Sequence, residues 1–106
     1  MITFEDFLKL DLRIGKVIQA EPHPNADKLY LLKVDIGEKI VQLVAGIRLS
    51  YTIEELKDKL VVVLVNLEPK EIRGFSSEGM LLAAQGEKGV SILSPVTPVA
   101  AGSKIK

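Results

Sequence analysis

The chain has 106 residues, enough for one domain with one hydrophobic core and too few for two. Its 14 basic side chains are matched by 14 acidic ones, whereas a nucleic-acid binder usually carries a basic excess, so composition argues mildly against such a ligand. Cysteine is absent, which excludes disulfides, thiolate metal sites and cysteine nucleophiles and fits a reducing, cytoplasmic compartment.

The first predicted elements are a short helix and a long bent strand. Thr3 is a candidate N-cap, and Asp6 lies where it would favour the positive helix end. The apolar face of this helix would consist of Phe4, Phe7 and Leu8. Residues 10–20 alternate as a strand does, but the phase slips at a glycine, so we expect a β-bulge that bends the strand at Gly15–Lys16. Two prolines then predict a loop over 21–27.

The rest of the chain is predicted to be mainly strands. A capping box, Thr52 with Glu55, opens a short helix within 51–59. The run 60–67 is apolar and β-branched, which indicates a strand buried on both sides. Further strands are expected at 28–36, 40–47, 79–84 and, as a short piece, 90–95. This order predicts an all-β fold, a five-stranded OB barrel with short helices and terminal additions, as one domain over 1–106.

Patterns for catalysis, metal binding and membrane insertion are weak. His23 is the only histidine and has no second strong ligand nearby. The sequence "GFSSEGM" lacks the order of a serine-nucleophile elbow, and no P-loop is present. The charged N-terminus does not resemble a signal peptide, and the longest apolar run is too short to cross a bilayer. We therefore predict no enzyme, no cofactor, no metal and no membrane contact.

Two polar segments are candidates for binding. In "HPNADKL" (23–29), Asn25 and Lys28 are residue types that contact phosphate and ribose, although an Asx-turn that satisfies the loop backbone is the simpler interpretation. The second segment, 66–80, contains Lys70, Arg73, two serines and glycines that permit close approach of a ligand. The segment also contains three glutamates, Glu68, Glu71 and Glu78, against its two cations, and the sequence leaves open whether these glutamates point toward a ligand.

Five segments carry a resemblance to a known family. "FEDFLKLDLRIGKV", "HPNADKLY", "LVAGI", "LVNLEPKEIRG" and "SSEGMLLAA" occur in this order and spacing. Together they resemble the tRNA-binding domain of the methionyl-tRNA synthetase C-terminus and its relatives, which include free-standing tRNA-binding proteins, an export-related chaperone and cofactors of synthetase complexes. The resemblance spans Phe4 to Lys104. It implies an OB barrel that forms a homodimer, grips tRNA by shape at its outer corner, and assists methionyl-tRNA synthetase in cis or in trans.

The resemblance also implies site residues. Those expected to bind tRNA are Asn25, Lys28, Asn66, Lys70, Arg73, Ser77, Gly79 and Met80. Met80 begins an apolar strand, so it would also be a core residue by default. Those expected to form the dimer interface are Phe4, Phe7, Leu8, Val96 and Val99. The alternative for these terminal segments is that they cover the open ends of the barrel.

The sequence departs from the family pattern at one turn. Relatives often carry basic residues there, whereas Glu68 and Glu71 flank Lys70 in this chain. Fewer phosphate contacts would lower RNA affinity and its dependence on salt. The departure favours a first alternative, a chaperone whose groove takes peptides. A second alternative is an assembly domain that docks onto a synthetase complex.

Overall fold

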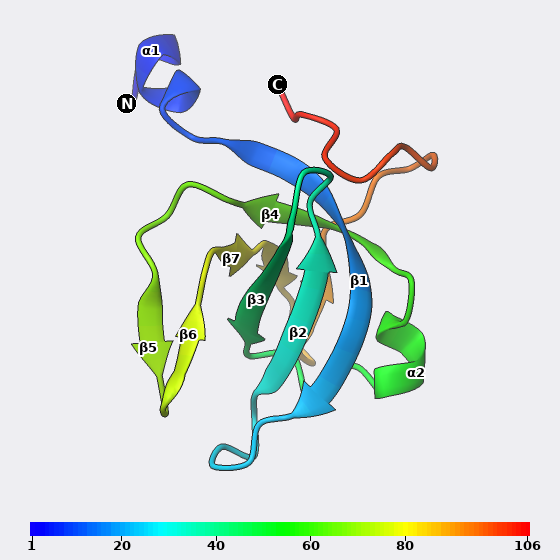
Figure 1. The fold of residues 1–106 in the computed structure, drawn as a ribbon. Helices are drawn as coiled ribbons and strands as arrows, with labels where there is room; N and C mark the ends of the chain where they lie inside the picture. Colours follow the sequence, from blue (N-terminus) through cyan, green and yellow to red (C-terminus); the bar gives the residue numbers. More distant parts are fainter.

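The computed structural model describes all 106 residues and shows a five-stranded antiparallel sheet that curls into a nearly closed barrel (Figure 1). Its spatial order is β3-β2-β1-β4-β7. The strands are β1 (Leu12–Pro22), β2 (Tyr30–Asp35), β3 (Ile40–Ala45), β4 (Leu60–Leu64) and β7 (Met80–Leu81). This arrangement confirms the OB-type barrel predicted from the sequence.

Two hairpins and two helices complete the fold. The strands β5 (Lys70–Ile72) and β6 (Phe75–Ser77) pair with each other, as do β8 (Ala83–Gln85) and β9 (Val90–Ile92). The helices are α1 (Phe4–Leu8) and α2 (Ile53–Leu56). Neither helix has the length and apolar character that crossing a membrane requires.

The hydrophobic core lies inside the barrel. Leu32, Val34, Leu43 and Val63 point inward from three strands and have no exposed surface. Leu56 of α2 joins this cluster and is also fully buried, so the helix contributes one apolar residue to the core. Burial of such side chains is the main stabilising contribution in a chain that has no disulfide.

The predicted N-cap Thr3 and the predicted capping box of Thr52 with Glu55 are both present, and Thr3 also forms a capping box. In α2, the Thr52 hydroxyl accepts from the Glu55 N–H at 3.2 Å, and the Glu55 carboxylate accepts from the Thr52 N–H at 2.8 Å. The hydrogen bond from the Thr52 backbone lowers the pKa of Glu55. In α1, Thr3 and Asp6 form the same reciprocal pair. Because these bonds use otherwise unpaired N–H groups, they allow two very short helices to form.

The bulge of β1 lies downstream of its predicted position. The register shifts between Val17 and Gln19, while Gly15 pairs regularly with Val61 of β4. A Cβ atom on Gly15 would lie 2.5 Å from Cγ1 of Val34, so this glycine is required by close packing inside the barrel. The prediction of a bulge at Gly15–Lys16 was therefore wrong.

Three other boundaries differ from the prediction. The fourth strand ends at Leu64 instead of residue 67, and its outer residues Leu60 and Val62 are only partly buried. The predicted strand 79–84 is divided between β7 and β8. At the residue between them the chain changes its pairing partner: the Leu82 N–H donates to the Val62 carbonyl of β4, and the Leu82 carbonyl accepts from the Leu93 N–H. The polar segment before it contains the β5–β6 hairpin, which its mixed composition did not predict.

Hydrogen bonds from the backbone and side chains of residues 77–78 close the barrel between β3 and the end of the hairpin. Glu78 N–H donates to the Gln42 carbonyl at 2.8 Å, and Gln42 N–H donates to the Glu78 carboxylate at 2.8 Å. The Ser77 hydroxyl accepts from Val44 N–H at 3.0 Å and donates to the Gly79 carbonyl at 3.1 Å. We call this line of contacts the seam. It satisfies backbone groups that the free edge of β3 would otherwise leave unpaired.

The two terminal segments lie at the same end of the barrel, beside the start of β1. The C-terminal tail runs beside β1, where Ile14 N–H donates to the Ser103 carbonyl at 2.8 Å and Gly102 N–H donates to the Ile14 carbonyl at 2.7 Å. Figure 1 shows that α1 projects away from the barrel at the same end of this strand, just before β1 begins. Between them, Arg13 binds Asp11 at 2.9 Å, which lowers the pKa of Asp11.

Substitution of Ser77 by Ala should destabilise the fold by about 1–3 kcal/mol, because the buried Val44 N–H loses its acceptor. Ser76→Ala is the matched control, because that side chain is exposed and makes no hydrogen bond; it should stay within about 0.5 kcal/mol of wild type. Thermal and urea denaturation measure both values. Equal stability of the two variants would contradict the role assigned to the seam.

Candidate nucleic-acid interface

The loop between β1 and β2 and the tip of the β5–β6 hairpin meet beside the lower end of the barrel in Figure 1. A hollow of about 400 Å³ lies between them and is lined by residues 26–29 and Arg73. Lys28 and Arg73, which are distant in the sequence and belong to the two candidate binding segments, therefore share one hollow. Asp27 is the acidic residue in the same lining.

The hairpin places Arg73 in a strained position. Ile72 pairs with Phe75, which leaves Arg73 and Gly74 as a two-residue turn with φ values of 53° and 91°. Positive φ at both central residues is the signature of a type I′ turn, where Asn and Gly are preferred. An arginine at the first position costs conformational energy, and such strain tends to persist where a side chain has a function. The turn directs a cation into solvent beside the loop.

Four of the expected binding residues are free to contact a ligand. Their side chains are exposed and make no hydrogen bond or ion pair within the chain: Asn25, Lys28, Lys70 and Arg73. Three are cations and the fourth is an amide, the donor types that bind phosphate and ribose oxygens.

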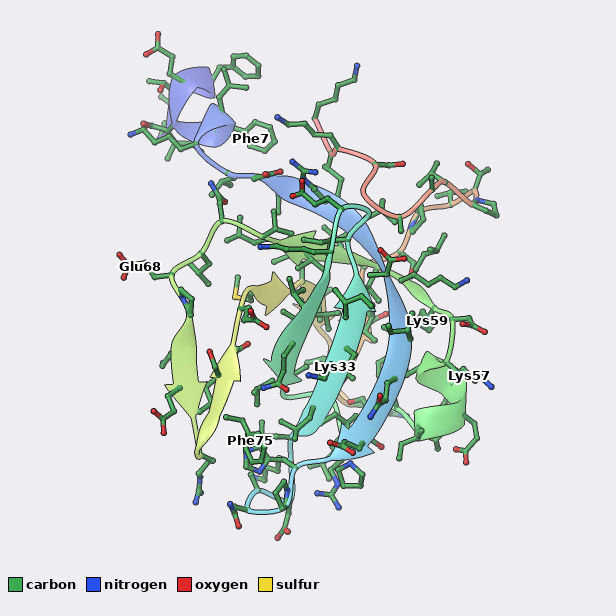
Figure 2. All side chains as sticks on the ribbon, viewed as in Figure 1. Phe7, Lys33, Lys57, Lys59, Glu68 and Phe75 are labelled. Carbon is green, nitrogen blue, oxygen red and sulfur yellow. The ribbon has the colours of Figure 1, made fainter.

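The three nearby glutamates do not line the hollow. In the hairpin register Glu71 pairs with Ser76, whereas Phe75 and Ser77 lie on the opposite face. Glu78 is bound to the Gln42 N–H in the seam. Figure 2 shows Glu68 pointing away from the barrel. The formal excess of negative charge in this segment is therefore directed away from the hollow that contains Lys28 and Arg73.

Three other expected residues form internal contacts. The Asn66 amide accepts from Asp11 N–H at 2.9 Å and donates to the Lys9 carbonyl at 2.8 Å, so it fastens the segment after α1 to the end of β4. Ser77 is buried in the seam, and a Cβ atom on Gly79 would lie 2.7 Å from the Leu64 carbonyl oxygen. The contacts of these three residues are therefore within the fold, at the end of β4 and along the seam.

Met80 is not a core residue, contrary to the default prediction. Met80 pairs with Leu64 of β4, and its neighbour Leu81 pairs with Val63. Because side chains alternate along a strand, Leu81 points toward the core and Met80 points away from it. Its side chain is 45 % exposed and lines an apolar hollow of about 230 Å³ beside β3.

Three residues near the candidate site were missed or misjudged in the sequence. Lys33 lies at the centre of the exposed sheet face in Figure 2 and donates to the Gln42 side chain at 2.9 Å. Arg48 donates to the Ala26 carbonyl at 3.2 Å and holds the first loop. His23, considered in the sequence only for metal binding or catalysis, is buried at the start of the loop, where its ring packs against Phe75 of the hairpin. Strand alternation could have found Lys33, but nothing in the sequence reveals the backbone partners of the other two.

The predicted dimer residues are exposed apolar side chains near the chain ends. Phe4, Leu8, Val96 and Val99 are open to solvent, and Phe7 is partly buried with its ring stacked on Phe4 at 6.3 Å. The alternative that these residues cover the ends of the barrel does not describe them, because their apolar surfaces remain in water. Large exposed apolar groups of this kind commonly mark contact surfaces.

The fold and this interface together define an OB-type binding domain with polar loops at one side of the barrel. A family model described as "Putative tRNA binding domain" matches residues 12–104. The chain belongs to this family, and the resemblance stated from the sequence is confirmed.

The curated relatives with high similarity are methionine--tRNA ligases. The chain is 51% identical to that of Pyrococcus horikoshii over 105 residues, and 50% identical to that of Nanoarchaeum equitans over 106 residues. These alignments cover 99% and 100% of the chain but 14% of each ligase. The chain thus spans about one-seventh of the length of these relatives.

Solved structures include relatives of similar length. A MetRS-related protein from Pyrococcus horikoshii superposes with a TM-score of 0.92 at 33% identity, covering 100% of the chain and 98% of that protein. A CsaA chaperone protein from Picrophilus torridus gives a TM-score of 0.94 at 35% identity, with complete coverage of both chains. The same barrel therefore occurs in proteins described as synthetase-related and as chaperones.

Proposed function

We propose that the protein binds tRNA through the loop at 23–29 and the β5–β6 hairpin, without catalysing a reaction, and assists a methionyl-tRNA synthetase in the cytoplasm. The observation that carries this proposal is the shared hollow, in which Lys28 and Arg73 are unpaired cations while the neighbouring glutamates point elsewhere. Family membership and the similarity to methionine--tRNA ligases support the choice of tRNA. Binding near a synthetase, in cis or in trans, would raise the local concentration of tRNA.

Recognition by shape is the mode that fits these residues. Phosphate and sugar contacts position a nucleic acid without reading its sequence. Stacking platforms for bases are scarce, because Phe75 is the only aromatic residue of the hairpin and it packs against His23 with centroids 5.0 Å apart. We therefore propose that binding tolerates different tRNA sequences and depends on their common backbone geometry.

A peptide-binding chaperone is the second candidate. Two observations favour it: the close similarity to CsaA chaperone structures and the apolar hollow around Met80, beside the free end of β3. An unfolded client peptide at micromolar concentration would bind saturably if this function is correct. Loss of that peptide binding in Met80→Glu would support this function and would locate the peptide at the apolar hollow.

We also propose that two copies associate through their terminal apolar residues. Phe4 and Leu8 lie on a helix of one turn and a half, far too short to be stable by itself, and the tail presents Val96 and Val99. A two-fold contact would bury these groups and place two interfaces on one tRNA.

Replacement of either cation should weaken tRNA binding. Lys28→Ala and Arg73→Gly should each lower affinity about tenfold, the value of one charge-assisted hydrogen bond, and reduce the salt slope by about one. Gly suits the φ of 53° at residue 73, so loss of binding cannot be assigned to a weaker fold. Filter-binding isotherms at two salt concentrations measure both quantities, with a hairpin RNA that lacks the tRNA elbow as a second ligand.

Lys57→Ala is the matched control, because Lys57 is an exposed, unpaired lysine next to α2, on the other side of the barrel in Figure 2. It should leave affinity within about twofold of wild type, as expected for a surface charge outside the contact. Equal binding of tRNA and the elbow-less hairpin, or equal losses in all three variants, would refute the proposed interface.

The dimer is tested by mass. Light scattering at micromolar concentration should give twice the 11.6 kDa mass of the chain, and Phe4→Asp with Leu8→Asp should give the monomer. Leu49→Asp is the control, since Leu49 is 77 % exposed but lies away from both chain ends in the sequence. A monomeric wild type would exclude the proposed association.

A further inference from the structure

His23 occupies the junction between the two parts of the candidate interface. It is one of only two polar residues with a buried side chain, and 2 % of its surface is exposed. Its ring meets the Phe75 ring edge-on at 5.0 Å. A buried polar group must satisfy its hydrogen bonds, so the partners of His23 show what the residue holds together.

Each ring nitrogen bonds to a different part of the interface. Nδ1 lies 2.9 Å from the Asn25 N–H, and Nε2 lies 3.2 Å from the Ile72 carbonyl oxygen. Because Nδ1 faces a donor and Nε2 faces an acceptor, the geometry assigns the proton to Nε2 in a neutral ring. His23 accepts from the loop and donates to the hairpin.

The bond to Ile72 is the only hydrogen bond between residues 23–29 and 70–77. The remaining bonds of the loop go to its own backbone and to Arg48. Those of the hairpin go to β3, at Gln42 and Val44, near the base of the hairpin and away from its tip. Without His23, no polar contact would fix the tip of the hairpin relative to the loop.

We propose that His23 is a positioning residue that sets the distance between Lys28 and Arg73 and does not itself contact RNA. Arg73 follows Ile72 directly, and Lys28 lies in the second turn of the loop, three residues after Asn25. Pro24 restricts the backbone of His23 to extended conformations, which fixes the direction of its ring. This role rests on the proposed tRNA interface, because His23 would hold the two cations of that interface at a fixed separation.

Two substitutions separate the two bonds. His23→Gln places an amide N–H near the position of Nε2 and keeps the donor to Ile72. His23→Asn places an amide oxygen near Nδ1, keeps the acceptor for Asn25 as in an Asx-turn, and loses the bond to the hairpin. Both variants lose the same ring packing against Phe75, so a difference between them reports the bond to the hairpin.

We expect His23→Asn to bind tRNA about fivefold more weakly than His23→Gln, the loss expected for one net hydrogen bond. In amide NMR spectra without RNA, both variants lose the His23 ring beside Phe75, but His23→Asn should displace the resonances of Gly74 and Phe75 further from their wild-type positions than His23→Gln does. Circular dichroism confirms that both variants are folded.

The two measurements separate this inference from the proposed function. If wild type does not bind tRNA, the proposed function fails, and an undisturbed hairpin in His23→Asn spectra would independently refute the coupling. If wild type binds but the two variants have equal affinities and equal hairpin resonances, His23 is only a packing residue and the inference is wrong.

Discussion

The closure of the barrel along the seam is the constraint on which the interface depends. β3 and β7 are the outer strands of the sheet and share no ladder, so the edge of β3 needs other partners. Ser77 and Glu78 supply them by bonding to Val44 and Gln42. Because these bonds anchor the end of β6 against β3, the preceding residues fold back as a hairpin beside the first loop. The position of the proposed binding surface therefore follows from how the barrel is closed.

The same contacts explain how a chain with no net charge can present unpaired cations on one surface. A net charge of zero would disfavour RNA if the charges were mixed on every surface. Here the seam uses Glu78, and strand alternation turns Glu71 away from Phe75 and Ser77. The cations at Lys28 and Arg73 remain unpaired at the hollow. Local segregation of charge therefore places two unpaired cations and one carboxylate, Asp27, at the hollow of a chain with no net charge, which is the surface proposed to contact RNA.

The sequence predicted what depends on local pattern. Alternating apolar residues located the main strands, and the pairs Thr3–Asp6 and Thr52–Glu55 located both helices. It failed where a distant backbone group determines the outcome. The need for Gly15 comes from Val34 across the barrel, and the roles of Asn66 and His23 come from carbonyl and N–H groups about 50 residues away. Residue types indicated the free cations, but the distinction between contact and support required the structure.

The most direct test of the account is to map the tRNA contact on the protein. Isotope-labelled protein titrated with tRNA should show its largest amide shifts in residues 23–29 and 70–76, with a smaller response at Lys33 of β2, whose side chain donates to Gln42. The surface at Lys57 and Lys59 should remain unchanged. Shifts confined to that surface or to the C-terminal tail, with none at the loop and the hairpin, would contradict the claim that these two segments form the binding site.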